Sequence, residues 1–253
     1  MKIQLYGKNS ADISDLVRNM GFEIVETNPD VILTYGGDGT LLASERQFPQ
    51  IPKLPIRDSK VCQKCSIHET EHLLQLLKNS QIEMTQQPKL ETTFDGNTLV
   101  ALNDIVIRNK SAYHAIRFYI SKNGEKIHIP ASNNQQSNSD LIIGDGIVAS
   151  TPFGSTGYYQ SITRTTFNEN FRIVFNNTVI SIPALEFTSA DEIILDIVRG
   201  PGEMTSDNNP ETIELIEGNQ VVIKVSSETA QIFSPETLRC NNCKIRRELR
   251  LHD

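Results

Sequence analysis

The stretch Tyr35-Gly36-Gly37-Asp38-Gly39-Thr40 decides how this sequence of 253 residues is interpreted. It follows the apolar run Val31–Tyr35, which predicts a strand covered on both faces. It precedes Leu41–Phe48, which is expected to be a helix. Glycines let backbone N–H groups approach phosphate oxygens closely, and the positive end of the helix points to the same place. Asp38 could hold a metal or accept a proton. The pattern favours a phosphate-binding turn over a tight turn that Asp38 merely caps.

The hydrophobic pattern changes once along the chain. From residue 1 to 88, strand and helix patterns alternate, which predicts an α/β domain of Rossmann type. From residue 89 to 232 the period is strand-like, and Asp95-Gly96 and Asn123-Gly124 are turn signals between strands. We therefore expect a β-rich second domain over residues 89–232.

Composition limits the function classes. The chain is 38% hydrophobic and 22% charged, which is typical of a globular protein, and its formal net charge of -7 argues against nucleic acid as a partner. No apolar run approaches the length of a membrane span, and the first residues lack a signal-peptide profile. The expected location is the cytoplasm, without a membrane partner.

A second motif combines Gly144-Asp145-Gly146 with the segment Ser150–Tyr158, which is rich in serine, threonine and glycine. Such a loop offers many hydrogen-bond donors with little side-chain bulk, so it could wrap a nucleotide ribose or phosphate. The alternative is a polar loop that leads into a helix.

Taken together, GGDGT (36–40), Leu102-Asn103-Asp104 and DGIVASTPFGSTGYYQS (145–161) resemble the NAD kinase family in order, spacing and residue type. GGDGT also occurs in diacylglycerol and sphingosine kinases, but the STP-GST-Y segment points to the NAD kinase branch. The resemblance implies an NAD kinase-like fold in which a tail, residues 233–253, returns to the first domain. It also implies an Mg²⁺-dependent transfer of phosphate from ATP or polyphosphate to the 2′-hydroxyl of NAD(H), in a dimer or tetramer.

The resemblance also implies roles for individual residues. Asp38 would help to remove the proton of the ribose hydroxyl. Phosphates would be cradled by Gly36, Gly37, Gly39 and Thr40. The dinucleotide would contact Asn103, Asp104, Asp145, Thr156, Tyr158 and Ser161, with Asp104 standing where the family usually has glutamate, and Asp145 at the nicotinamide end.

Several segments depart from the family pattern. Leu54–Lys60 replaces a glycine-rich stretch, and Ile162–Thr165 replaces Gly-Gly-Pro. Phe153 stands at a usual threonine or serine, Gly157 stands at a usual alanine, and no clear Asp-Gly-Gln occurs near residues 203–220. These departures leave two alternatives open, namely a non-catalytic nucleotide-binding homologue and a kinase of a different nucleotide or lipid.

The four cysteines form two CxxC pairs, Cys62/Cys65 and Cys240/Cys243, which is the ligand set of a structural four-thiolate zinc site. The alternatives are reduced thiols or a redox pair. His68 and His72 also fit the H-E-x-x-H pattern of metalloproteases, or could join Cys62 and Cys65 on zinc.

Overall fold

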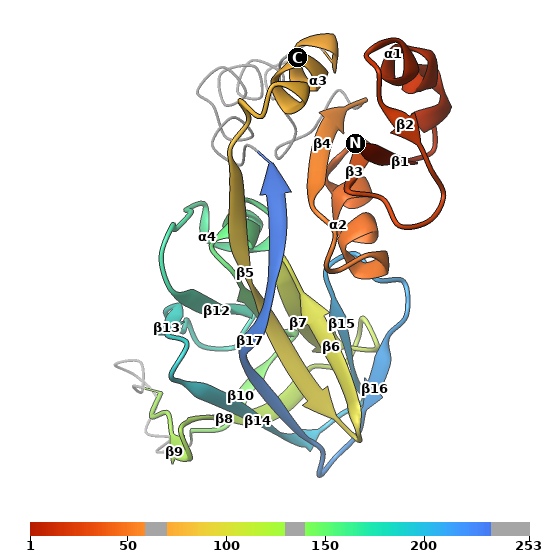
Figure 1. Cartoon of the computed structure of the whole chain (residues 1–253). Coiled ribbons are helices and arrows are strands. Elements are labelled where there is room, and N and C mark those ends of the chain that lie inside the picture. Colours follow the sequence, from red (N-terminus) through yellow and green to blue (C-terminus); the bar gives the residue numbers. More distant parts are fainter. Residues whose placement is uncertain (59–69, 130–139, 234–253) are drawn as a thin grey trace, which may run out of the picture. The chain divides into compact units, whose positions relative to one another are not determined.

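A computed structural model describes residues 1–58, 70–129 and 140–233, which fold as two compact units (Figure 1). Unit 1 comprises Met1–Gln87 and the end of the last strand from Thr229, and unit 2 comprises Pro88–Glu228. Two long strands, β5 (Met84–Phe94) and β17 (Gln220–Phe233), contribute residues to both units. Within the described residues, no helix has the length and apolarity needed to cross a membrane.

Unit 1 is a parallel sheet with helices on both faces. In the sheet β4 lies beside β3, then β1, then β2, and the end of β17 pairs with β4. The elements of this unit are β1 (Lys2–Tyr6), the 3-10 helix η1 (Ser10–Ile13), α1 (Ser14–Asn19), β2 (Glu23–Ile24), β3 (Val31–Gly36), α2 (Asp38–Gln47), β4 (Lys53–Arg57) and α3 (Thr70–Lys78).

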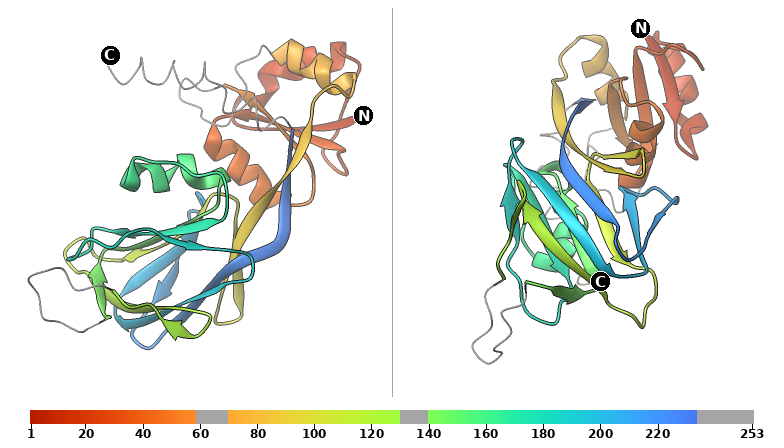
Figure 2. Two further views of the ribbon diagram at one scale, coloured as in Figure 1. Left: turned by 90° about the vertical axis from the view of Figure 1, so that its left-hand side faces the viewer. Right: turned by 90° about the horizontal axis from the view of Figure 1, so that it is seen from below.

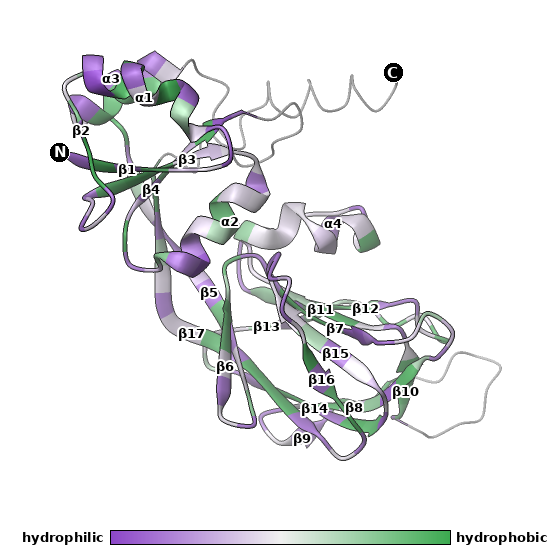
Figure 3. Cartoon of the chain, turned by 90° about the vertical axis from the view of Figure 1, so that its right-hand side faces the viewer, coloured by the Kyte–Doolittle hydropathy of each residue, from purple (hydrophilic) through white to green (hydrophobic). Residues whose placement is uncertain are grey.

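The alternation of side chains along β3 explains how the helices are distributed. Val31 and Leu33 are buried in one cluster with Val17 of α1 and Leu73 of α3. Ile32 lies between them and therefore points to the opposite face. The ribbon places α1 and α3 on one side of the sheet and α2 on the other (Figures 1 and 3). Both faces of β3 are thus covered, as its continuous apolar sequence predicts.

Unit 2 consists of two packed sheets (Figure 2). One has the order β13-β12-β11-β7-β15-β16, and the other contains β10-β8-β14-β17 with β5, β6 and β9. The bounds are β6 (Asn97–Ala101), β7 (Asp104–Asn109), β8 (Ile116–Lys122), β9 (Glu125–Lys126), β10 (Ile142–Gly144), β11 (Gly146–Ser150), η2 (Phe153–Thr156), α4 (Tyr158–Thr163), β12 (Phe171–Asn176), β13 (Leu185–Phe187), β14 (Glu192–Arg199), β15 (Gly202–Ser206) and β16 (Ile213–Leu215).

The core of unit 2 lies between the sheets, where Ile107 and Ile147 of the first pack with Phe118 and Leu195 of the second. On the outer face of the first sheet, Val106 packs in a smaller cluster with the aromatic rings of α4 and the loop that follows it. Strand β7 is therefore apolar on both faces, and α4 is fixed to the outer one.

The two predicted hairpin turns are confirmed. Asp95 and Gly96 connect β5 to β6, and Asn123 and Gly124 connect β8 to β9. All four residues have positive φ, between 48° and 82°, as a two-residue turn between twisted antiparallel strands requires.

A buried ion pair joins the end of α2 to the start of β4. The Lys53 ammonium contacts the Glu45 carboxylate and donates to the carbonyl of Phe48. The Lys53 and Glu45 side chains are 0% and 3% exposed. Removing one partner of such a pair leaves a charge without compensation in an apolar surrounding. The pair therefore fixes α2 against the sheet.

We expect Lys53→Met to lower the free energy of unfolding by about 3–5 kcal/mol, because the buried Glu45 carboxylate then loses its contact with the Lys53 ammonium. Adding Glu45→Leu should recover most of this loss, because both charges are then replaced by apolar groups of similar size. Urea unfolding of the wild type, the two single variants and the double variant measures the coupling. A double variant as unstable as the sum of the two single variants would contradict it.

Candidate functional site

The GGDGT stretch forms the junction between β3 and α2 in unit 1. Gly36 is the last residue of β3, Gly37 is the N-cap of α2, and Asp38 is the first helical residue. The N–H groups of Thr40 and Leu41 donate to the Gly37 carbonyl and close the first turn. A Cβ on Gly36 would overlap the Thr40 side chain, so this glycine is needed for the sharp entry into the helix. The helix starts three residues earlier than the sequence predicts.

Other polar residues lie beside this junction. The N–H of Asp58 donates to the Gly36 carbonyl at 3.2 Å, and the amide of Asn9 donates to the Asp58 carboxylate at 2.9 Å. Burial raises the pKa of the Tyr35 hydroxyl, and the negative charges of Asp58 and Asp12 raise it further. Asn9 and Asp58 follow strands β1 and β4, so three strands bring polar groups to the carboxyl edge of the sheet, where ligands bind in α/β folds. Asn9 and Asp58 lie outside the motifs that the sequence indicates.

In unit 2, a short segment holds Asn103 and Asp104 just before and at the start of β7. Both side chains are nearly buried, with 8% and 6% exposure. The backbone N–H groups of Leu102, Asn103 and Asp104 all donate to the carboxylate of Asp207, at 3.0, 2.6 and 3.2 Å. Asp207 belongs to none of the motifs that the sequence indicates. The available signal was Asp207-Asn208-Asn209 at a strand end, a composition typical of side chains that bond nearby backbone groups.

The serine- and threonine-rich loop packs directly on this segment. The Thr151 hydroxyl donates to the Leu102 carbonyl at 2.6 Å, and the Thr151 N–H donates to the Asn103 carbonyl at 2.9 Å. A Cβ on Gly154 would overlap the backbone of Asn103, so the loop lies as close as two backbones can. A Cβ on Gly157 would lie 3.8 Å from the Asn103 amide nitrogen and 3.9 Å from a carboxylate oxygen of Asp104. Both side chains therefore point toward the start of α4.

Helix α4 presents two of the predicted dinucleotide residues to solvent. Tyr159 is 2% exposed and packs edge-on against Phe167, with ring centroids 4.7 Å apart, which anchors the helix. Tyr158 and Ser161 are exposed, and the Tyr158 hydroxyl accepts a hydrogen bond from the Asn176 side chain at 3.1 Å. Thr156 is half-buried at the end of η2.

Asp145 lies between β10 and β11, and two asparagines orient it. Its carboxylate accepts from Asn177 at 2.9 Å and from Asn109 at 3.3 Å. The register of β7 against β11 pairs Asp104 with Ser150 and Arg108 with Gly146, so Asp145 and Asp104 lie at opposite ends of β11. At the rise of a strand this separates them by about 17 Å. Thr156, Asn103 and Asp104 lie at one end, and Asp145 lies at the other.

No group of three or more His, Cys, Asp or Glu side chains that could hold a metal occurs within residues 1–58, 70–129 and 140–233. Cys62, Cys65, His68, Cys240 and Cys243 lie outside the described residues. His72 is in α3.

The chain is similar to curated NAD kinases from archaea and bacteria. It is 29% identical to the NAD kinase of Sulfurisphaera tokodaii over 210 residues, which cover 78% of each chain. It is 24% identical to the NAD kinase of Saccharolobus solfataricus over 227 residues, covering 87% of this chain and 86% of the relative. No family model matches the chain.

Solved structures share the fold. The crystal structure of an NAD kinase from Archaeoglobus fulgidus in complex with ATP superposes with a TM-score of 0.79 at 18% identity, covering 98% of this chain and 99% of the other. Yeast NADH kinase complexed with NADH superposes with a TM-score of 0.76 at 16% identity, covering 92% and 83%. The predicted fold class, an α/β first domain with a β-rich second one, is thereby confirmed. Over most of its length the chain is thus similar in sequence to NAD kinases, and it shares their fold.

Proposed function

We propose that this protein transfers a phosphoryl group from ATP to the 2′-hydroxyl of the adenosine ribose of NAD(H), forming NADP(H). The observation that carries the proposal is the junction of β3 with α2, where GGDGT places Asp38 in the first turn of a ten-residue helix. Support comes from relatives named NAD kinase and from the like-folded structures with ATP and with NADH.

The local geometry of the junction suits phosphoryl transfer. Phosphoryl transfer needs positioning and charge neutralisation more than covalent chemistry. The positive end of the α2 dipole favours a phosphate at the start of this helix, and the glycine-rich stretch Gly36–Thr40 lies there. The Asp38 carboxylate would accept the proton of the ribose hydroxyl as that oxygen bonds to the terminal phosphorus of ATP. The bond from this phosphorus to the bridging oxygen breaks, and ADP leaves with that oxygen.

Mg²⁺ fits this donor set. In phosphotransferases it is usually bound by one or two carboxylates and the phosphate oxygens of the substrate, rather than by an all-protein cage. Asp38 is the carboxylate that would hold it, and the ion would supply charge neutralisation on the transferred group.

The dinucleotide is assigned to unit 2. Asn103 and Asp104 offer an amide and a carboxylate to the ribose hydroxyls, next to the half-buried Thr156. Tyr158 and Ser161 offer an aromatic face and a hydroxyl from the exposed side of α4. Asp145, at the far end of β11, is assigned to the nicotinamide end.

We also propose that the protein is cytoplasmic and forms a homo-oligomer, either a dimer or a tetramer. One structural Zn²⁺ is proposed to be bound by Cys62, Cys65, Cys240 and Cys243. Two residues between the cysteines of each pair let both sulfurs reach one ion, and two pairs complete a tetrahedron.

We expect Asp38→Asn to reduce NADP formation from NAD and ATP to less than about a tenth of the wild-type rate, because a general base contributes about 10²–10⁴-fold and an amide cannot accept the proton. The matched control is Asp15→Asn, the same substitution in the first turn of α1, which should leave the rate unchanged. Asp38→Asn with more than a tenth of the wild-type rate would show that Asp38 has another role. Wild-type protein that binds NAD without turnover would instead identify a nucleotide-binding homologue.

Thr156→Val and Tyr158→Ala should each weaken the binding of NAD more than the binding of ATP, because both residues are assigned to the dinucleotide. Isothermal titration calorimetry with each ligand separately measures this. Tyr113→Ala removes an aromatic ring that is 81% exposed elsewhere in unit 2, so it should change neither affinity. Equal losses of affinity for NAD and for ATP would show that the loop is not part of the dinucleotide site.

Protein purified without added metal should contain about one zinc per chain, by the four-thiolate stoichiometry. Cys240→Ser should lower both the zinc content and the melting temperature, because the ligands assemble only in the folded chain. Elemental analysis and thermal unfolding check both. Zinc retained by the double variant Cys240→Ser/Cys243→Ser would assign the metal to Cys62, Cys65, His68 and His72 instead.

A further inference from the structure

The Asp207 carboxylate fills a concave arrangement of three successive backbone N–H groups. One of its oxygens, Oδ2, accepts from Leu102 at 3.0 Å, and the other, Oδ1, accepts from Asn103 at 2.6 Å and Asp104 at 3.2 Å. Successive N–H groups that converge in this way form an anion-binding nest. Hydrogen bonds to an ionised carboxylate are about twice as strong as neutral ones, so Asp207 holds this segment firmly.

The backbone of Asp207 has a conformation that suits its contact with the Leu102–Asp104 segment. β15 pairs with β7 up to Ser206 opposite Ile105, and the next residue, Asp207, has a φ of 50°. Asp and Asn tolerate this left-handed conformation better than most residues. Its own N–H donates back to the Asp104 carbonyl at 2.8 Å, which closes a reciprocal link between the two strand ends.

The opposite side of the same segment is held by different groups. The carbonyls of Leu102 and Asn103 accept from the hydroxyl and the N–H of Thr151. With its N–H groups on Asp207 and these carbonyls on Thr151, the segment has little freedom to rotate. The Asn103 and Asp104 side chains are therefore directed toward Gly157 by the backbone that carries them.

We propose that Asp207 is a positioning residue for the dinucleotide, acting through the backbone of Leu102–Asp104 to orient the Asn103 amide and the Asp104 carboxylate. The inference rests on the proposed function, because it assigns those two side chains to NAD(H). Asp207 acts on them without contacting the substrate itself.

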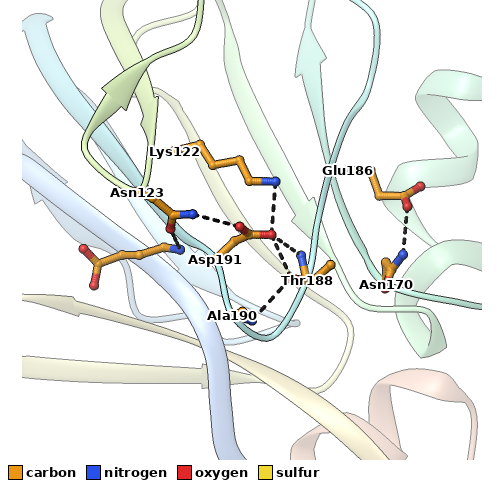
Figure 4. Close-up of polar contacts among 8 residues, drawn as sticks. Lys122, Asn123, Asn170, Glu186, Thr188, Ala190 and Asp191 are labelled. Atoms are coloured by element: carbon orange, nitrogen blue, oxygen red, sulfur yellow. Dashed lines mark hydrogen bonds and ion pairs between the residues drawn. The ribbon is translucent and has the colours of Figure 1, made fainter.

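A second aspartate in unit 2 provides a matched comparison. The Asp191 carboxylate accepts from the Thr188 N–H at 2.7 Å, the Thr188 hydroxyl at 2.8 Å, Asn123 at 2.9 Å and Lys122 at 3.0 Å (Figure 4). These bonds hold the pKa of Asp191 well below its usual range, led by the bond from the Thr188 backbone. Asp191 thus stabilises a surface turn as a bonded carboxylate, but the turn carries no proposed substrate group.

Asp207→Asn removes the carboxylate but keeps the backbone conformation, so it tests the carboxylate alone. Asparagine has the same shape and accepts the positive φ, but one oxygen becomes an NH₂ group that faces an N–H donor. We expect the KM for NAD to rise at least about tenfold, since a small misplacement of binding groups can cost up to 10²-fold. The KM for ATP should change less than about twofold, because the altered segment is assigned to the dinucleotide.

The control variant Asp191→Asn should lower the melting temperature without changing either KM. Amide hydrogen exchange gives a readout that needs no activity, and Asp207→Asn should accelerate exchange at Leu102, Asn103 and Asp104. Faster exchange with unchanged NAD affinity would overturn the positioning role, as would equal effects of the two variants on the KM for NAD. If the wild type binds NAD but forms no NADP, the proposed function fails, and the NAD affinity of Asp207→Asn still decides the inference. A wild type that does not bind NAD overturns both.

Discussion

The conformation of both motif regions depends on close contacts that only glycine allows, because glycine has no Cβ. In unit 1, Gly36 lets the Thr40 side chain lie against the end of β3, so the chain turns at once from strand into helix. In unit 2, Gly154 lies on the backbone of Asn103, so the polar loop is seated on the start of β7. In each case a Cβ would overlap its neighbour and move the polar groups that follow. The glycines of the two motifs therefore have a packing role that is independent of any ligand.

Features encoded by neighbouring residues could be predicted from the sequence. The turns at Asp95-Gly96 and Asn123-Gly124 were predictable because their conformation depends on the two turn residues themselves. Strand β3 was predictable because burial on both faces leaves an unbroken apolar run. Helix boundaries were predicted less well. The helix expected over Leu41–Phe48 is α2, which also includes Asp38, Gly39 and Thr40 and ends at Gln47.

Features that join distant residues could not be predicted in this way. Asp207 bonds to residues more than 100 positions earlier, and no local pattern indicates which backbone groups its carboxylate meets. The same holds for Asn177, which orients Asp145 from across the β11–β12 pair. The buried pair of Lys53 with Glu45 is closer in sequence, yet a lysine in a strand is normally read as exposed. Such contacts depend on the strand register. The register is set by the packing of the whole core and not by any local pattern in the sequence.

In the polar loop Ser150–Tyr158, the departures from the family pattern change the packing of the loop more than they change its hydrogen-bonding groups. Phe153 replaces a hydroxylated residue, but its side chain is 2% exposed, so the change enlarges the apolar anchor of the loop. Gly157 replaces alanine where a Cβ would lie 3.2 Å from the Gly154 carbonyl, so the missing methyl relieves a tight contact. The groups that point toward the start of α4, Asn103 and Asp104, keep their backbone hydrogen bonds in this arrangement. The loop can therefore differ in sequence from the family while holding the same kinds of polar group beside α4.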